Sequence, residues 1–155
     1  RQMNASMRYA HGEENQLDYW SRSNQMSGVP ASRPKFVSYI DQSADINDRV
    51  KAYLDINCAH CHQQNARCDY RPIRLSFSQT ADLTKMGVCV MADEPLGSSL
   101  EKIITPGNPA KSVMHFRLNS TNENNRMPLL GRTIVHDEGV ELLKQWISSL
   151  NQTCP

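Results

Sequence analysis

Two cysteines and a histidine in the middle of the chain have a spacing that suits one specific chemistry. Cys58, Cys61 and His62 read C-x-x-C-H. Two thiols three positions apart can each form a thioether with a vinyl group of one porphyrin, and the histidine beside them can ligate its iron. The pattern predicts one covalently bound haem c with its iron. A redox dithiol and half of a zinc site share the C-x-x-C part and stay open as alternatives.

A second iron ligand is expected further along the chain, at Met127. Pro128 follows it directly, asparagines precede it, and Gly131 ends the segment, so the methionine lies on a stiff, irregular loop. A thioether is a soft, neutral ligand that suits haem iron. Met127 is therefore the candidate opposite His62. The weaker candidates are Met114 and His115, interpreted as core and surface residues, and the loose residues Met3, Met7, His11 and Met26.

Composition excludes several classes of function. The chain has 155 residues, is 39% hydrophobic and carries a net charge of +1. A near-neutral chain has no basic face for nucleic acid and no polybasic patch for membranes. No apolar run approaches the ~20 residues of a transmembrane helix. The thin apolar content favours a core completed by a large apolar cofactor, and the start at Arg1 favours a removed leader or a piece of a longer protein.

The other three cysteines indicate the compartment. Cys68 and Cys89 bracket a loop of about 20 residues, and a disulfide between them is their simplest role, with two buried free thiols as the alternative. Cys154 has no evident partner within the chain. Covalent haem and disulfides both belong outside the bacterial cytoplasm, so we expect a periplasmic, extracellular or cell-surface protein.

Hydrophobic periodicity predicts a helix from about Asp45, capped by Asp45 or Asn47, that runs into Cys58. A last helix is expected over 137–150, capped by Asp137 and crossing the first near Tyr53 and Trp146. Between them we expect a short extended stretch over 73–77 and a short helix over 110–118. Residues 1–44 are polar and predict an N-terminal arm or linker, with a short helix around Leu17, and residues 45–155 form the haem domain.

Several motifs together resemble a class I-type cytochrome c domain of the kind found at the C-terminal end of larger secreted bacterial proteins. They are Asn57-Cys58-Ala59-His60-Cys61-His62, Ile103-Ile104-Thr105-Pro106-Gly107-Asn108-Pro109 with Ser112, Arg117-Leu118, Met127-Pro128-Leu129, and Gly139-Val140 with Trp146-Ile147. The resemblance implies a mainly α cytochrome c fold with few helices around one haem. It also implies attachment through Cys58 and Cys61, with His62 and Met127 as axial ligands.

The function expected from these residues is electron transfer, as a free carrier or as a subunit of a larger redox complex joined through residues 1–44. His/Met ligation fills both axial positions of the iron, so no reaction beyond redox is expected and the partners are redox proteins. The alternatives are a five-coordinate, peroxidase-like haem enzyme and a structural cytochrome module. Arg117, Arg126 and Arg132 are candidates to meet the haem carboxylates, with solvation at the surface as the simpler interpretation.

Overall fold

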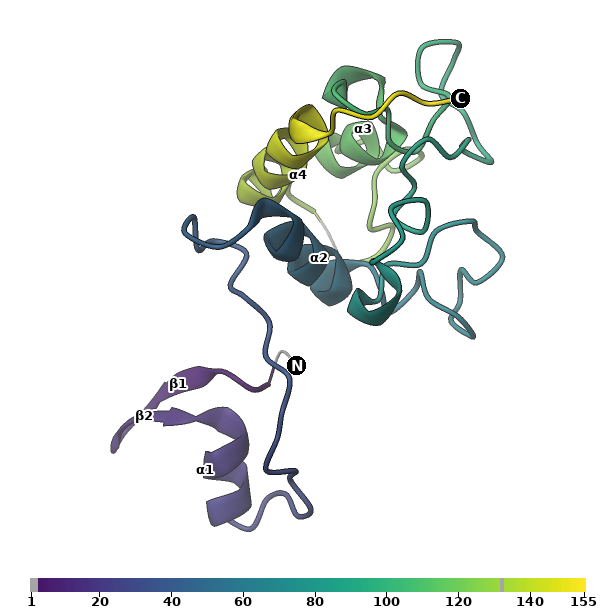
Figure 1. Ribbon diagram of the computed structural model, residues 1–155. Helices are drawn as coiled ribbons and strands as arrows, with labels where there is room; N and C mark the ends of the chain where they lie inside the picture. Colours follow the sequence, from purple (N-terminus) through teal and green to yellow (C-terminus); the bar gives the residue numbers. More distant parts are fainter. Residues whose placement is uncertain (1–2, 132) are drawn as a thin grey trace. The chain divides into compact units, whose positions relative to one another are not determined.

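The computed structural model describes residues 3–131 and 133–155, and its chain forms two units, Arg1–Ser38 and Tyr39–Pro155. Figure 1 shows a hairpin and one helix in the first unit and the longer helices in the second. Residues 39–44 belong with the second unit because Tyr39 packs there. Its carbonyl accepts a hydrogen bond from Arg49 Nε (2.9 Å), and its ring meets Tyr53 edge-on at 5.5 Å.

The first unit is a β-hairpin followed by a helix. Strand β1 (Ser6–Tyr9) pairs antiparallel with β2 (Gly12–Asn15) across a two-residue turn, and Gly12 has φ +125°, which suits glycine. Helix α1 (Gln16–Arg22) begins at Asn15, whose side chain accepts from the Leu17 amide at 3.0 Å. Tyr9 stacks on Tyr19 at 4.0 Å and joins the hairpin to the helix.

This hairpin corrects the predicted fold class. The expected mainly α cytochrome c fold was wrong, because the described residues contain a two-stranded antiparallel sheet as well as four α-helices. The strands escaped prediction because they are short and largely exposed: β1 offers only Met7 and Tyr9 as alternating apolar residues, and β2 has no large apolar side chain. The pairing is held by the backbone and by stacked rings instead. The arm expected over 1–44 is thus structured in its first part.

Helix α2 (Ile46–Asn57) begins where the sequence predicts. The Asp45 carboxylate accepts from the amides of Asn47 (2.9 Å) and Asp48 (3.4 Å) and so satisfies two free donors of the first turn. One face of the helix is buried through Val50, Ala52, Tyr53 and Leu54. The helix ends at Asn57, and Cys58 follows as its C-terminal cap.

Helix α4 (Asp137–Ser149) packs against α2, as Figure 1 shows. The two helices approach so closely that a Cβ on Gly139 would lie 2.1 Å from the Tyr53 hydroxyl oxygen. Trp146 is fully buried, and its Nε1 donates to Asn47 Oδ1 at 2.9 Å. The expected capping residue was wrong: His136 is the N-cap and makes no side-chain capping bond, while Asp137 already lies in the first turn.

The segment between α2 and α4 is mostly irregular and supplies the rest of the core. It contains two short 3-10 helices (Phe77–Gln79 and Pro109–Lys111) and helix α3 (Val113–Asn119). Residues 73–77 form no strand in the part of the chain described, although Ile73 and Leu75 are buried. The Leu75 amide instead donates to the His62 carbonyl at 2.7 Å. These residues therefore close the loop that follows the C-x-x-C-H motif.

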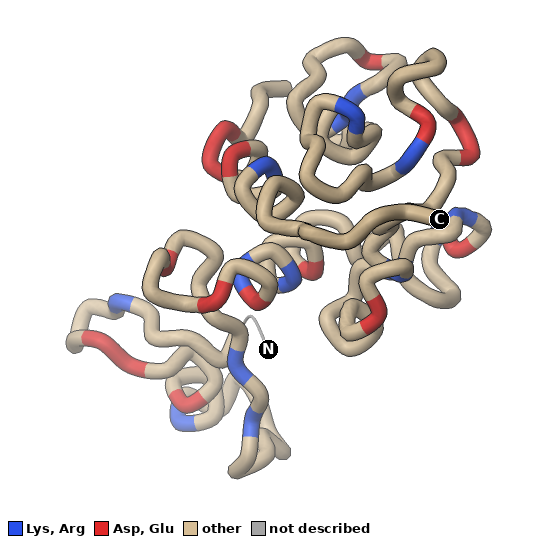
Figure 2. Tube along the Cα trace, turned by 45° about the horizontal axis from the view of Figure 1, so that its top comes forward, with Lys and Arg blue, Asp and Glu red and all other residues tan. Residues whose placement is uncertain are grey.

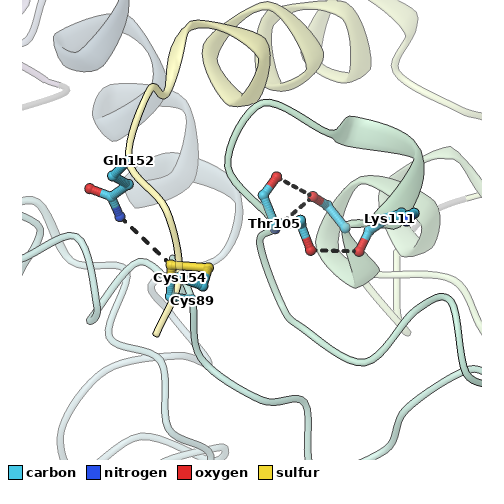
Figure 3. Close-up of a disulfide and its surroundings, with 6 residues drawn as sticks. Cys89, Thr105, Lys111, Gln152 and Cys154 are labelled. Atoms are coloured by element: carbon cyan, nitrogen blue, oxygen red, sulfur yellow. Dashed lines mark hydrogen bonds between the residues drawn. A yellow bond between two sulfur atoms is a disulfide. The ribbon is translucent and has the colours of Figure 1, made fainter.

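A disulfide closes the second unit, but it is not the one predicted. Cys89 pairs with Cys154, 65 positions apart, and Cys68 is a free thiol, so the expected Cys68–Cys89 bridge was wrong. The Gly107 amide donates to the Ile147 carbonyl near the end of α4 (2.9 Å), and the chain beyond the helix carries Cys154 to Cys89 (Figure 3). Closing a loop of this length restricts the unfolded chain by about 4 kcal/mol in the chain-entropy account.

Charge and helix length add two observations at the surface. Basic and acidic residues are interspersed along the chain (Figure 2), in keeping with the net charge of +1. Across residues 3–131 and 133–155, none of the helices has the length and apolar character that a membrane crossing requires.

The contact between α2 and α4 predicts the effect of Gly139→Ala. The new methyl group would collide with the buried Tyr53 ring, so we expect the free energy of unfolding to fall by about 1–3 kcal/mol, despite the better helix propensity of alanine. Urea unfolding of the full chain measures it. The exposed Gln145→Ala on the same helix is the control and should change stability by less than about 0.5 kcal/mol. Equal urea midpoints for the two variants would contradict the close contact.

Candidate cofactor site

The C-x-x-C-H motif folds as a tight turn that continues from α2. The Cys58 amide donates to the Leu54 carbonyl (2.9 Å), and the Cys58 carbonyl accepts from the amides of Cys61 (3.1 Å) and His62 (2.9 Å). The last turn of the helix is thus extended by two further hydrogen bonds. Cys58, Cys61 and His62 are held on one rigid support, as attachment to a single flat group requires.

An apolar cavity opens beside this turn. The space inside it that water-sized molecules can occupy is about 130 Å³, and the cavity is partly open to solvent. Cys58, His62 and Met127 all line it, although Met127 is 65 positions from His62 in sequence. The apolar lining comes from several segments between α2 and the Met127 loop: Leu54, Pro72, Ile73, Leu75, Ala92, Ile103, Val113, Met114, Leu118 and Pro128.

His62 has an available ring nitrogen in this cavity. Its Nδ1 is buried and has no hydrogen-bond partner among the residues that the structure describes. Burial lowers the pKa of the imidazole, and the charges of Arg71, His60 and Arg74 lower it further, so the ring is neutral near pH 7. A neutral imidazole with an unsatisfied nitrogen is the form that ligates iron.

Met127 reaches the cavity because its loop is fastened to α3. The Met127 amide donates to the Arg117 carbonyl (2.9 Å), and Arg117 Nη1 donates to the Asn125 carbonyl (3.2 Å). The Arg126 amide in turn donates to the Asn122 carbonyl at 2.8 Å. Three hydrogen bonds therefore fix an irregular loop at the point where the methionine enters the site.

The two weaker candidates from the same region differ in position. Met114 on α3 also lines the cavity, so the position of the side chain alone does not separate it from Met127. His115 is absent from the described lining of this cavity, and its Nε2 is buried without a described hydrogen-bond partner. Burial lowers its pKa as well, followed by the charge of Lys144.

The two cysteines of the motif lie in different surroundings. Cys58 lines the cavity, and burial raises the pKa of its thiol to about 12, with a smaller contribution from Cys61. Its thiol is therefore protonated near pH 7. Cys61 is partly exposed and is not among the described residues that line the cavity. Attachment of one group to both sulfurs would require the Cys61 side chain to turn toward the cavity.

Two arginines and two carboxylates form a charged rim on the same cavity. Glu94 pairs with Arg71 (2.5 Å) and with Arg117 (3.5 Å), and Asp93 pairs with Arg71 (3.2 Å). The hydrogen bond from Arg71 holds the pKa of Glu94 below its usual range. Both arginines are largely covered whereas the Glu94 side chain is 62% exposed, so the acid can move away while the cations stay.

Sequence reasoning found only part of this rim. Arg117 was one of three candidates, and it lines the cavity; Arg126 is absent from the described lining, and Arg132 lies outside the described residues. Arg71 was missed. It lies in the irregular segment after the motif, 22 positions before its partner Asp93, and no spacing rule marks such a pair. The fold alone shows that Arg71, which directly precedes Pro72, belongs to the charged rim of the cavity.

Comparison with known proteins returns no family model, no curated protein and no solved structure that matches this chain. The resemblance to a class I-type cytochrome c domain was therefore wrong as a family assignment. The described residues also contain no group of three or more His, Cys, Asp or Glu side chains placed to hold a metal ion. The short motifs on which the resemblance depended do not extend to a relationship over the whole chain.

The burial of Cys58 predicts an order of thiol reactivity in the cofactor-free chain. Because the thiolate is the reactive form, and its stronger nucleophilicity offsets only part of the loss, the raised pKa should slow alkylation of Cys58 at pH 8 by about 10–100-fold relative to an ordinary thiol. Timed labelling of the reduced, folded chain with iodoacetamide, read by peptide mass spectrometry, measures it. Cys68 in the same molecule is the control, and labelling in urea should bring the rates together. Equal rates in the folded chain would refute the burial of Cys58.

Proposed function

We propose that this chain carries one covalently attached haem and transfers single electrons through it. One observation carries the proposal: Cys58, His62 and Met127, from two segments far apart in sequence, line one apolar cavity. The proposal depends on this cavity and its residues, and not on membership of a family. A cavity that joins one thiol, an imidazole and a thioether in an apolar lining, with the second thiol Cys61 in the same turn, has ligand chemistry that suits a covalently bound haem.

The residues present fit such a group in three respects. The Nδ1 atom of His62 is buried without a hydrogen-bond partner among the described residues, and the neutral imidazole suits an iron ligand. The apolar walls suit the face of a porphyrin. Arg71 and Arg117, now paired with Glu94, suit the two carboxylates of a haem.

Each residue then has a separate role. Cys58 and Cys61 would hold the group by thioethers, His62 would ligate the iron on one side, and Met127 would do so on the other. The bound haem supplies a one-electron couple, whose potential histidine and methionine ligands raise. The chain itself positions the ligands, keeps water away through its apolar walls, and balances the carboxylates with arginine.

The site also supports a proposal about partners and compartment. If His62 and Met127 both held the iron, no position would be left for a substrate, so the partners would be electron donors and acceptors, met alone or within a larger redox complex through residues 1–44. The Cys89–Cys154 disulfide is of a kind that persists in oxidising compartments. We therefore place the protein in the periplasm or outside the cell.

Production of the full chain with a haem-attachment apparatus tests the proposal. We expect a coloured protein whose haem absorption stays with the polypeptide after denaturation. Its pyridine haemochrome spectrum should be that of a haem in which both vinyl groups have been converted to thioethers. Cys58→Ala with Cys61→Ala should abolish the attached colour. His62→Ala should lower the yield of coloured protein several-fold, while the exposed His60→Ala in the same turn should leave it unchanged. A colourless chain with intact cysteines would refute the proposal.

The role of Met127 is tested by Met127→Leu, which removes the sulfur and keeps the volume. Because axial ligands shift haem potentials over about 0.8 V, we expect a fall on the order of 0.1 V with the haem still attached. Redox titration measures it. Met114→Leu, which alters the same cavity, is the matched control and should shift the potential far less. The reverse ranking would assign the ligand to Met114, and no shift in either variant would favour a five-coordinate haem enzyme.

A further inference from the structure

Three cysteines remain reduced in the structure once Cys89 and Cys154 have paired. Cys58, Cys61 and Cys68 are free thiols, and each residue is partly exposed, although the Cys58 thiol lies in the apolar cavity, where burial raises its pKa. The proposed function uses Cys58 and Cys61 and gives no role to Cys68. In an oxidising compartment a partly exposed thiol near another thiol tends to form a disulfide.

Cys68 lies next to Cys61. The Cys68 amide donates a hydrogen bond to the Cys61 carbonyl at 3.0 Å. Because a Cα lies about 1.5 Å from its own nitrogen and about 2.4 Å from its own carbonyl oxygen, this bond keeps the two Cα atoms within about 7 Å, close to the range of about 4.4–6.8 Å that a disulfide spans. Cys58 is placed differently, because its side chain is on the wall of the apolar cavity, where Cys61 and Cys68 are absent from the described lining.

The loop that carries Cys68 is held in place by several further bonds. Arg74 donates to the Asp69 carbonyl (2.7 Å) and pairs with the Asp69 carboxylate (2.6 Å). The Asp69 side chain also accepts from the Asn65 amide (2.9 Å), and the Arg71 amide donates to the Cys68 carbonyl (3.0 Å). Residues 61–74 are thus a fixed set of turns, so the nearness of Cys61 and Cys68 is a property of the fold.

We propose that Cys61 and Cys68 form a disulfide in the cofactor-free chain, and that this bond withholds Cys61 from haem attachment until a thiol reduces it. The second half of this statement depends on the proposed function, whereas the bond itself does not. Cys68 then protects the attachment thiol during the time before the haem arrives.

The chemistry is thiol–disulfide exchange. The sulfur–sulfur bond of an oxidised partner, such as glutathione disulfide, breaks as one bond forms between the Cys61 and Cys68 sulfurs. The two cysteines lose two electrons and two protons, and the partner leaves as two thiols. Reduction by a dithiol reverses each step and frees Cys61 to form a carbon–sulfur bond.

The chain is well suited to a direct test, because Arg67 lies between the two cysteines. Trypsin cleavage after Lys51 and Arg67 releases residues 52–67 with Cys58 and Cys61, and cleavage after Arg74 releases residues 68–74 with Cys68. The two peptides stay joined only through a disulfide of Cys68. The full cofactor-free chain, equilibrated with glutathione disulfide, blocked with N-ethylmaleimide and digested without reductant, should give the joined pair.

Matched variants assign the bond. Cys58→Ala should keep the joined pair, and Cys61→Ala should abolish it. A Cys58–Cys61 bond within peptide 52–67, a Cys58–Cys68 bond, disulfide-linked dimers, or three blocked thiols under oxidising conditions would each overturn the proposal.

A second measurement separates this proposal from the proposed function. Haem attachment to the oxidised chain should need added dithiol, and Cys68→Ser should raise attachment without dithiol several-fold. Equal attachment to both chains without dithiol would overturn the protective role. A joined peptide pair together with no attachment under any condition would leave the disulfide standing and refute the haem function instead.

Discussion

The close contact of α2 and α4 at Gly139 is the constraint on which the candidate site depends. The absence of a side chain at Gly139 lets the Tyr53 ring lie against the α4 backbone, and this fixes α2. The turn with Cys58, Cys61 and His62 continues from the end of α2 by backbone hydrogen bonds. The contact of α2 with α4 at Tyr53 thus positions the whole C-x-x-C-H motif, which begins about one and a half helical turns after Tyr53. His136 strengthens the crossing, stacked on Tyr53 with a 3.1 Å hydrogen bond to its hydroxyl.

The cavity itself is assembled largely from segments that have no regular structure. Helices α2 and α3 supply two of its walls, and the irregular chain from Arg71 to Leu75 and from Ala92 to Glu94 supplies much of the rest. Backbone hydrogen bonds to other segments hold these loops in place. The Leu75 amide donates to the His62 carbonyl, and the Met127 amide donates to the Arg117 carbonyl on α3. An apolar lining with a charged rim arises here from packing, and the rim places cations where an apolar ligand with carboxylates would end.

The sequence predicts local features well and distant pairings poorly. Helix α2 follows from periodicity and capping and α4 from periodicity alone, and Cys58, His62 and Met127 line one cavity as their chemistry suggests. The Cys89–Cys154 bond and the Arg71–Glu94 pair depend on how loops fold back, and spacing carries no information on this. The two strands of the hairpin are short and mostly polar, so the pattern of hydrophobic residues did not predict them. The similarity of short motifs led to a wrong family and fold assignment, because motifs that suit one cofactor do not establish a common fold or ancestry.

The hydrogen bond between the Met127 amide and the Arg117 carbonyl has a consequence for variation in this chain. It ties Met127 directly to the backbone of α3, while the two inner bonds, Arg117 to Asn125 and Arg126 to Asn122, shape the loop between them. Doubling the length of such a loop costs only about 0.6 kcal/mol in closure entropy. Changes of length in the exposed stretch 121–124 can therefore accumulate while the bond to Arg117 keeps the methionine in place, so the outer surface of this loop is free to diverge between descendants of this protein.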